Sequence, residues 1–113
     1  MEVIKMLSNK YSVIPCDIIK SGINLEKIGI NELAWEKNEI NKIVRILRKE
    51  EIPVLGGDVY RIENGIIEST YDSWFLNNNG EDDFVEKSLD KTISYVEDYE
   101  NNNHGKNIFV LVF

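Results

Sequence analysis

Two carboxylates, Asp58 and Asp72, are the pair that this sequence could bring together for chemistry. They flank Asn64-Gly65, the strongest short-range signal of a two-residue hairpin turn. In the register that this turn sets, Asp72 lies diagonal to Asp58 and on the opposite face. We therefore expect structural roles: Asp58 accepts hydrogen bonds within the core, and Asp72 holds a strand end or a loop. A catalytic or metal-binding pair is the alternative if a β-bulge changes the register.

The other chemically capable residues are isolated in the sequence. His104 lies in an Asn- and Gly-rich turn, which is typical of a solvated side chain. The single cysteine, Cys16, has no partner for a disulfide, and we expect it to be a small buried apolar side chain. Gly56-Gly57 lacks the lysine and the following helix of a phosphate-binding loop, so a bulge or close backbone packing explains it better. The sequence predicts no catalytic residue, no metal and no cofactor.

Hydrophobic periodicity predicts two long helices. The first spans about residues 38–51, where Pro53 ends it and apolar side chains recur at helical spacing. The second spans about residues 83–99, after an acidic run that suits the positive end of a helix dipole: Glu81, Asp82 and Asp83. A short amphipathic helix is expected over Val3–Leu7, and Asn24 is expected to cap a turn through residues 25–28 that Gly29 ends.

The remaining apolar runs predict strands. A hairpin spans about residues 54–75, and a continuously apolar C-terminal strand spans about residues 107–113. Alternation places successive hairpin residues on two opposite faces. The expected core face holds Val54, Asp58, Tyr60, Ile62, Ile67, Tyr71 and Phe75. The other face holds Leu55, Val59, Arg61, Glu68, Asp72 and Trp74. In this register Asp58 pairs with Tyr71 and Leu55 with Trp74. A bulge at Gly56-Gly57 would reverse the faces beyond it. The expected fold is α+β: one domain, residues 1–113, with a small antiparallel or mixed sheet packed against helices.

The chain carries a formal charge of −7, with 20 carboxylates against 13 cations. This balance argues against nucleic acid or an anionic membrane as the main partner. It leaves two interpretations, solubility and attraction to a basic protein. No run is long enough to span a bilayer, the first residues do not read as a signal peptide, and a single cysteine suits a reducing cytoplasm.

Several segments together resemble one known family. They are Gly29-Ile-Asn-Glu-Leu-Ala-Trp35, the helix after it, Val54-Leu-Gly-Gly-Asp-Val-Tyr60, Tyr71-Asp-Ser-Trp74 and the closing Phe109-Val-Leu-Val112. In order and spacing, from about Ile23 to the C-terminus, this pattern is similar to the immunity protein 40 family of bacterial polymorphic-toxin systems. The Leu-Gly-Gly-Asp-Val-Tyr block is the specific part. The residues on either side of Trp74 depart from the family pattern: the family more often has Asn before the Trp, where this chain has Ser73, and Tyr after it, where this chain has Phe75.

The resemblance implies a cytoplasmic protein that binds a cognate toxin domain and neutralises it, without being an enzyme. A charge of −7 suits a basic toxin, such as a nuclease. The shared motif then builds the scaffold (Gly56, Gly57, Asp58, Tyr60, Tyr71), and the expected partner-binding residues are Asp72, Trp74, Glu81, Asp82 and Asp83. For Trp74, packing under the helices or the acidic loop is the alternative to contact with a partner. Two alternatives stay open: a small ligand-binding or enzymatic domain that uses Asp58 and Asp72, and a self-associating structural subunit. The sequence leaves monomer and homodimer undecided.

Overall fold

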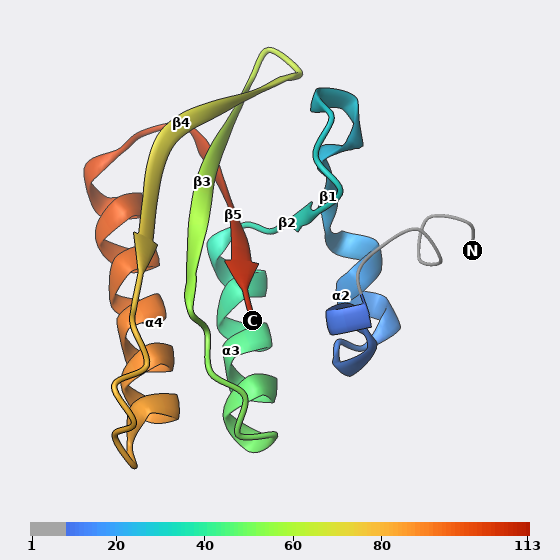
Figure 1. Cartoon of the computed structure of the whole chain (residues 1–113). Helices are drawn as coiled ribbons and strands as arrows, with labels where there is room; N and C mark the ends of the chain where they lie inside the picture. Colours follow the sequence, from blue (N-terminus) through green and yellow to red (C-terminus); the bar gives the residue numbers. More distant parts are fainter. Residues whose placement is uncertain (1–8) are drawn as a thin grey trace.

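The computed structural model describes residues 9–113, so the helix expected over Val3–Leu7 lies outside the described residues. A three-stranded antiparallel sheet in the order β4-β3-β5 packs against two long helices, and a two-stranded sheet of β1 and β2 lies beside it (Figure 1). The elements in chain order are η1 (Asn9–Val13), α2 (Cys16–Ser21), β1 (Ile23–Asn24), η2 (Leu25–Ile28), β2 (Leu33–Ala34), α3 (Lys37–Lys49), β3 (Gly56–Glu63), β4 (Ile66–Phe75), α4 (Phe84–Asn102) and β5 (Lys106–Val112). The predicted α+β class is confirmed.

Local sequence rules account for most of these elements. The apolar stripe of α3 is wholly buried: Ile40, Ile43, Val44 and Leu47. Asn64 and Gly65 both have positive φ, 51° and 78°, as a type I′ hairpin turn requires. Asn24 caps η2 by accepting the Glu26 amide at 2.9 Å, and Gly29 ends that turn in the left-handed conformation. Each of these predictions is confirmed.

The three-stranded sheet has two faces, which we call the helix face and the outer face. On the helix face, Trp74, Val59, Phe109 and Leu111 belong to one core with residues of α3 and α4. On the outer face, Tyr60, Ile108 and Val110 form a second, smaller core with Leu25 and Ala34 from the chain before α3. That segment covers only part of the outer face, since Phe75 and Val112 beyond it are exposed.

The predicted core face of the hairpin is only partly right: Val54 and Tyr60 are buried as expected, but other residues are on the wrong face. Trp74 and Val59, which were placed on the less buried face, lie against the helices. Asp58, Tyr71 and Phe75, which were placed in the core, are exposed. The reason is that both faces of the sheet are partly covered. The apolar residues on the same face as Tyr60 pack against residues 23–34 and not against the helices.

The predicted register is confirmed only near the turn. Pairing from Glu63–Ile66 to Tyr60–Ser69 is as expected, but Asp58 then pairs with Ser73 instead of Tyr71, and Trp74 pairs with Gly57 instead of Leu55. Because β4 contains two more residues than β3 between these pairs, the bulge lies in β4 and not at Gly56-Gly57. The two glycines instead allow close backbone packing, since a β-carbon would lie 2.2 Å from the Trp74 carbonyl oxygen at Gly56 and 2.3 Å from the Val110 carbonyl oxygen at Gly57.

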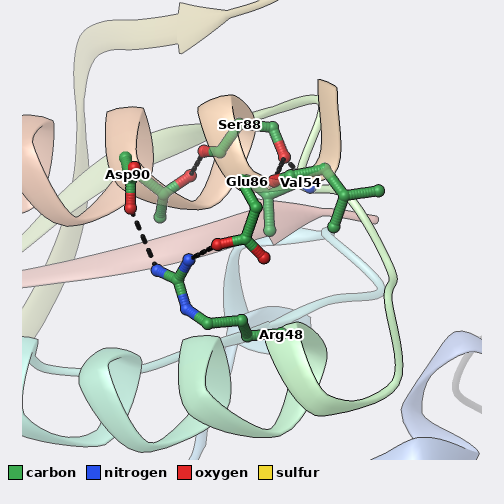
Figure 2. Close-up of polar contacts among 7 residues, drawn as sticks. Arg48, Val54, Glu86, Ser88 and Asp90 are labelled. Atoms are coloured by element: carbon green, nitrogen blue, oxygen red, sulfur yellow. Dashed lines mark hydrogen bonds and ion pairs between the residues drawn. The ribbon is translucent and has the colours of Figure 1, made fainter. Parts of the chain in front are cut away.

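Polar contacts fix α3 against α4 and hold the chain that follows α3. The Arg48 guanidinium donates to Glu86 and, at 3.1 Å, to Asp90 (Figure 2). Buried Ser88 accepts the Val54 amide at 3.0 Å, which satisfies a backbone donor that water cannot reach. These contacts set where the chain enters β3.

Cys16 corrects another expectation, because the structure places it at the surface and not in the core. It begins α2, whose buried positions are Ile18 and Ile19, so the helix turns the cysteine outward. His104 is exposed, as its turn predicted. Within residues 9–113 no helix is both long and apolar enough to cross a membrane.

Stability is expected to fall at alkaline pH because of Tyr11. Its buried hydroxyl donates to Glu32 at 2.7 Å and accepts the Leu33 amide at 3.0 Å, and burial raises its pKa well above the ordinary 10.0. Since the folded pKa is higher than the unfolded one, this stabilisation is complete below about pH 10 and is lost as the pH rises further. We expect the free energy of unfolding in urea to decline from about pH 10 to about pH 11.

The matched variant is Tyr11→Phe, which removes the titrating group. It should be less stable at neutral pH, by roughly 1–3 kcal/mol, because the Leu33 amide loses its partner. Its alkaline decline should be shallower than that of the wild type. Some decline should remain, since burial also raises the pKa of Tyr60 and Tyr95. Equal alkaline slopes in the two proteins would contradict this role for Tyr11.

Candidate functional site

A bulge in β4, which we call the β4 bulge (Thr70–Asp72), is the most unusual feature of the sheet. Between the Tyr60–Ser69 and Asp58–Ser73 pairs, these three residues lie opposite Val59 alone. The Thr70 hydroxyl donates to the Val59 carbonyl at 2.8 Å, so a side chain replaces the missing backbone bond of the ladder. The bulge is therefore a stable part of the fold.

The β4 bulge presents Tyr71 to solvent. This side chain is 93% exposed, and its φ of 64° is a conformation that a bulky residue rarely adopts. Such strain costs on the order of 1 kcal/mol or more and persists only when its surroundings impose it. A large aromatic side chain that is both strained and exposed contributes little to the core, so we look for its role outside the domain.

Local contacts hold Tyr71 in this conformation from both sides. Its amide donates to the Ser69 hydroxyl at 3.1 Å, and the Asp72 amide donates to the Thr70 hydroxyl at 3.1 Å. The Asp72 carboxylate accepts the Tyr99 hydroxyl of α4 at 2.7 Å. Burial raises the pKa of Tyr99, and the Asp72 carboxylate raises it further, so this hydroxyl remains a donor at neutral pH.

These contacts also occupy backbone donors at the middle of β4. The strand is an edge of the sheet, since its order is β4-β3-β5, whereas the outer edge of β5 is partly paired with Trp35. A regular exposed edge invites another strand to pair with it, and a bulge prevents this. A partner at the β4 bulge must therefore be bound through side chains and not by strand addition.

Exposed apolar and acidic side chains lie beside the β4 bulge at the uncovered end of the outer face. Phe75 and Val112 both pair with Gly56, on either side of a residue that has no side chain, and Phe75 is 73% exposed. One row further along, Ser73 and Asp58 pair on the same face. Exposed aromatic side chains are enriched at protein-binding sites, and a carboxylate at the edge of such a site adds charge selectivity.

The predicted site residues separate into three groups. Asp72 belongs to the β4 bulge, but its carboxylate is bound to Tyr99. Trp74 is 5% exposed and its ring stacks on Tyr95 with 4.5 Å between centroids, so of the two alternatives for this side chain the structure has packing under a helix and not exposure on a binding surface. The acidic run Glu81–Asp83 is exposed just before the N-terminus of α4, at the opposite end of that helix from Tyr99, and Lys87 pairs there with Glu81 and Asp83.

The scaffold residues divide in the same way. Gly56, Gly57 and Tyr60 are buried in the sheet. Asp58 and Tyr71 are exposed. Asp58 lies on the outer face of the sheet, whereas the Asp72 carboxylate contacts Tyr99 of α4, so the two carboxylates do not meet. Residues 9–113 contain no group of acidic, His or Cys side chains that could hold a metal ion.

Sequence reasoning missed Tyr71 as an exposed residue. The available signal was the cluster of short hydroxyl side chains around it: Ser69, Thr70 and Ser73. Such side chains bond to nearby backbone and compete with regular ladders, which favours a local irregularity. Alternation alone, which assumes an unbroken pleat, placed Tyr71 in the core.

Comparison with known proteins agrees with the sequence motifs. A family model described as Immunity protein 40 matches residues 24–113, close to the span expected from about Ile23 onward. No curated protein and no solved structure gives a significant match. The match covers the sheet, α3, α4 and the β4 bulge, and it leaves out the chain before Asn24. This chain belongs to the Immunity protein 40 family.

Proposed function

We propose that this chain is a cytoplasmic immunity protein that neutralises a cognate toxin domain by binding it at the β4 bulge and the adjoining exposed end of the outer face. The observation that carries the proposal is Tyr71, an exposed aromatic side chain held in a strained conformation by its neighbours. Tyr is enriched among residues that dominate binding energy, and a preorganised side chain loses little entropy on binding. Membership of an immunity protein family supports the role.

The distribution of charge supports a basic toxin, such as a nuclease. Helix α3 carries five cations and one carboxylate, so the rest of the chain carries eight cations against nineteen carboxylates. The acidic excess therefore lies outside α3, and Asp58 contributes to it on the outer face. Complementary charge raises the association rate and favours the correct partner. The exposed run Glu81–Asp83 adds to this acidic excess.

The test is to co-express this chain with the C-terminal domain of any large secreted protein encoded just upstream. We expect a stable complex and rescue of growth. For a basic toxin, the association rate should fall steeply as salt is raised from about 0.05 M to about 0.5 M. An association rate that does not change with salt would refute a basic partner. No complex and no rescue of growth would refute immunity to that toxin.

Self-association is the second candidate, because Leu55, Phe75 and Val112 are exposed apolar side chains near one another at the end of the sheet. Light scattering over a range of protein concentrations distinguishes the two. A dimer that Phe75→Ser converts to monomer would assign this end of the sheet to a second copy. A monomer at all concentrations would leave the surface to a different protein.

A further inference from the structure

The surface of α3 that faces away from the core differs in charge from the rest of the molecule. Lys42, Arg45 and Lys49 are exposed there, and Arg48 is partly exposed. The like charges of Arg45 and Lys49 lie four residues apart, a spacing that destabilises a helix by a few tenths of a kcal/mol. We call these four cations the α3 basic face.

Two hollows flank the α3 basic face. One, of about 320 Å³, lies between α3 and α4 and is lined by Asn41, Val44, Arg45, Arg48 and Ile93. The other, of about 350 Å³, lies between α2 and α3 and is lined by Ile18, Lys42, Arg45, Ile46 and Lys49. Arg45 borders both. Each hollow therefore combines aliphatic side chains with cations, as a site for an acidic and partly apolar segment requires.

Ion pairs within the domain use only part of this charge. Lys42 pairs with Glu39 at 3.1 Å, and Arg48 pairs with Glu86 and Asp90 (Figure 2). No carboxylate of the described residues forms an ion pair with Arg45 or Lys49. These two cations are the ones available to an external anionic group.

We propose that the α3 basic face binds an acidic amphipathic helix of a partner protein. Aliphatic side chains of that helix would enter the two hollows, and its carboxylates would meet Arg45 and Lys49. The inference is independent of the proposed function, because α3 packs on the helix face of the sheet and leaves the outer face free.

The structure favours this occupant over three others. Nucleic acid is disfavoured because Glu86 and Asp90 stand beside Arg48 and the whole chain is acidic. A membrane is disfavoured because the aliphatic side chains Ile46 and Ile93 are only partly exposed and line hollows. A second copy is disfavoured because the acidic helix of this chain, α4, uses its apolar stripe internally.

The experiment uses the full chain and a labelled helical peptide of about four turns, with Leu on one face and Glu on the other. We expect saturable binding by fluorescence anisotropy, with amide resonances of α3 shifting in NMR spectra. Arg45→Glu and Lys49→Glu should each weaken binding about tenfold. Lys27→Glu is the matched control, since it makes the same charge change at an exposed residue of η2.

Specificity is tested with a peptide of the same composition in scrambled order, a single-stranded oligonucleotide and vesicles of anionic lipid. The proposal requires the ordered peptide to bind more tightly than each of these. Equal binding of the scrambled peptide, equal loss in Lys27→Glu, or tighter binding of the oligonucleotide or vesicles would overturn it. So would a dimer of the free protein that Arg45→Glu dissociates, since a second copy would then occupy the face.

Discussion

Replacing Gly57 by alanine is expected to lower the free energy of unfolding by about 3 kcal/mol, a large share of the stability of a domain this small. A β-carbon at this position would lie 2.3 Å from the Val110 carbonyl oxygen and 2.4 Å from the Trp74 ring. Neither neighbour can move aside easily. Val110 belongs to the paired strand β5, and the Trp74 ring, next to Gly57 on one side, stacks on Tyr95.

Gly80→Ala is the matched control for this prediction. Gly80 has a φ of 79° and open space around it, so an alanine there should cost only about 1 kcal/mol of backbone strain. Urea unfolding of both variants, followed by far-ultraviolet circular dichroism, measures the difference. If the free energy of unfolding falls equally in the two variants, the close packing of Gly57 against Trp74 does not contribute to stability as argued.

Replacing Tyr71 by glycine is expected to weaken binding and leave the fold intact, whereas the Gly57 variant loses stability. We expect the affinity for the cognate toxin to fall at least about thirtyfold. A central aromatic residue of a protein interface contributes about 2 kcal/mol or more, which corresponds to that factor. Because glycine adopts a φ of 64° without strain and the side chain is 93% exposed, the free energy of unfolding should stay within about 1 kcal/mol of the wild type. Toxin affinity and urea unfolding are measured on the same preparation.

Two further variants show whether the effect belongs to the aromatic side chain. Tyr71→Phe keeps the ring and should retain most of the affinity. Ile66→Gly removes another exposed apolar side chain from the same strand, at the turn end and away from the β4 bulge, and should change affinity little. A Tyr71→Gly protein that still neutralises the toxin with wild-type affinity would remove the β4 bulge from the interface.

The elements of this fold follow from local sequence rules, because each depends on neighbours in the chain. The stripe of α3 needs only the spacing of apolar residues, and the hairpin turn needs only two residues that tolerate positive φ. The register next to the turn follows for the same reason, from Glu63–Ile66 to Tyr60–Ser69. The motif segments were also sufficient to indicate the family, since a motif is itself a local pattern.

The candidate site could not be predicted in this way, because its geometry depends on contacts between distant elements. The β4 bulge is fixed by the Val59 carbonyl of the neighbouring strand and by Tyr99, twenty-seven positions from Asp72. Which face of the hairpin meets the helices depends on residues 23–34, which bury Tyr60 on the other face. The sequence by itself determined the helices, the turn, the acidic charge and the family. Only the tertiary structure decided that Trp74 is buried and Tyr71 exposed, because a period of two cannot distinguish the faces of a sheet that is covered on both.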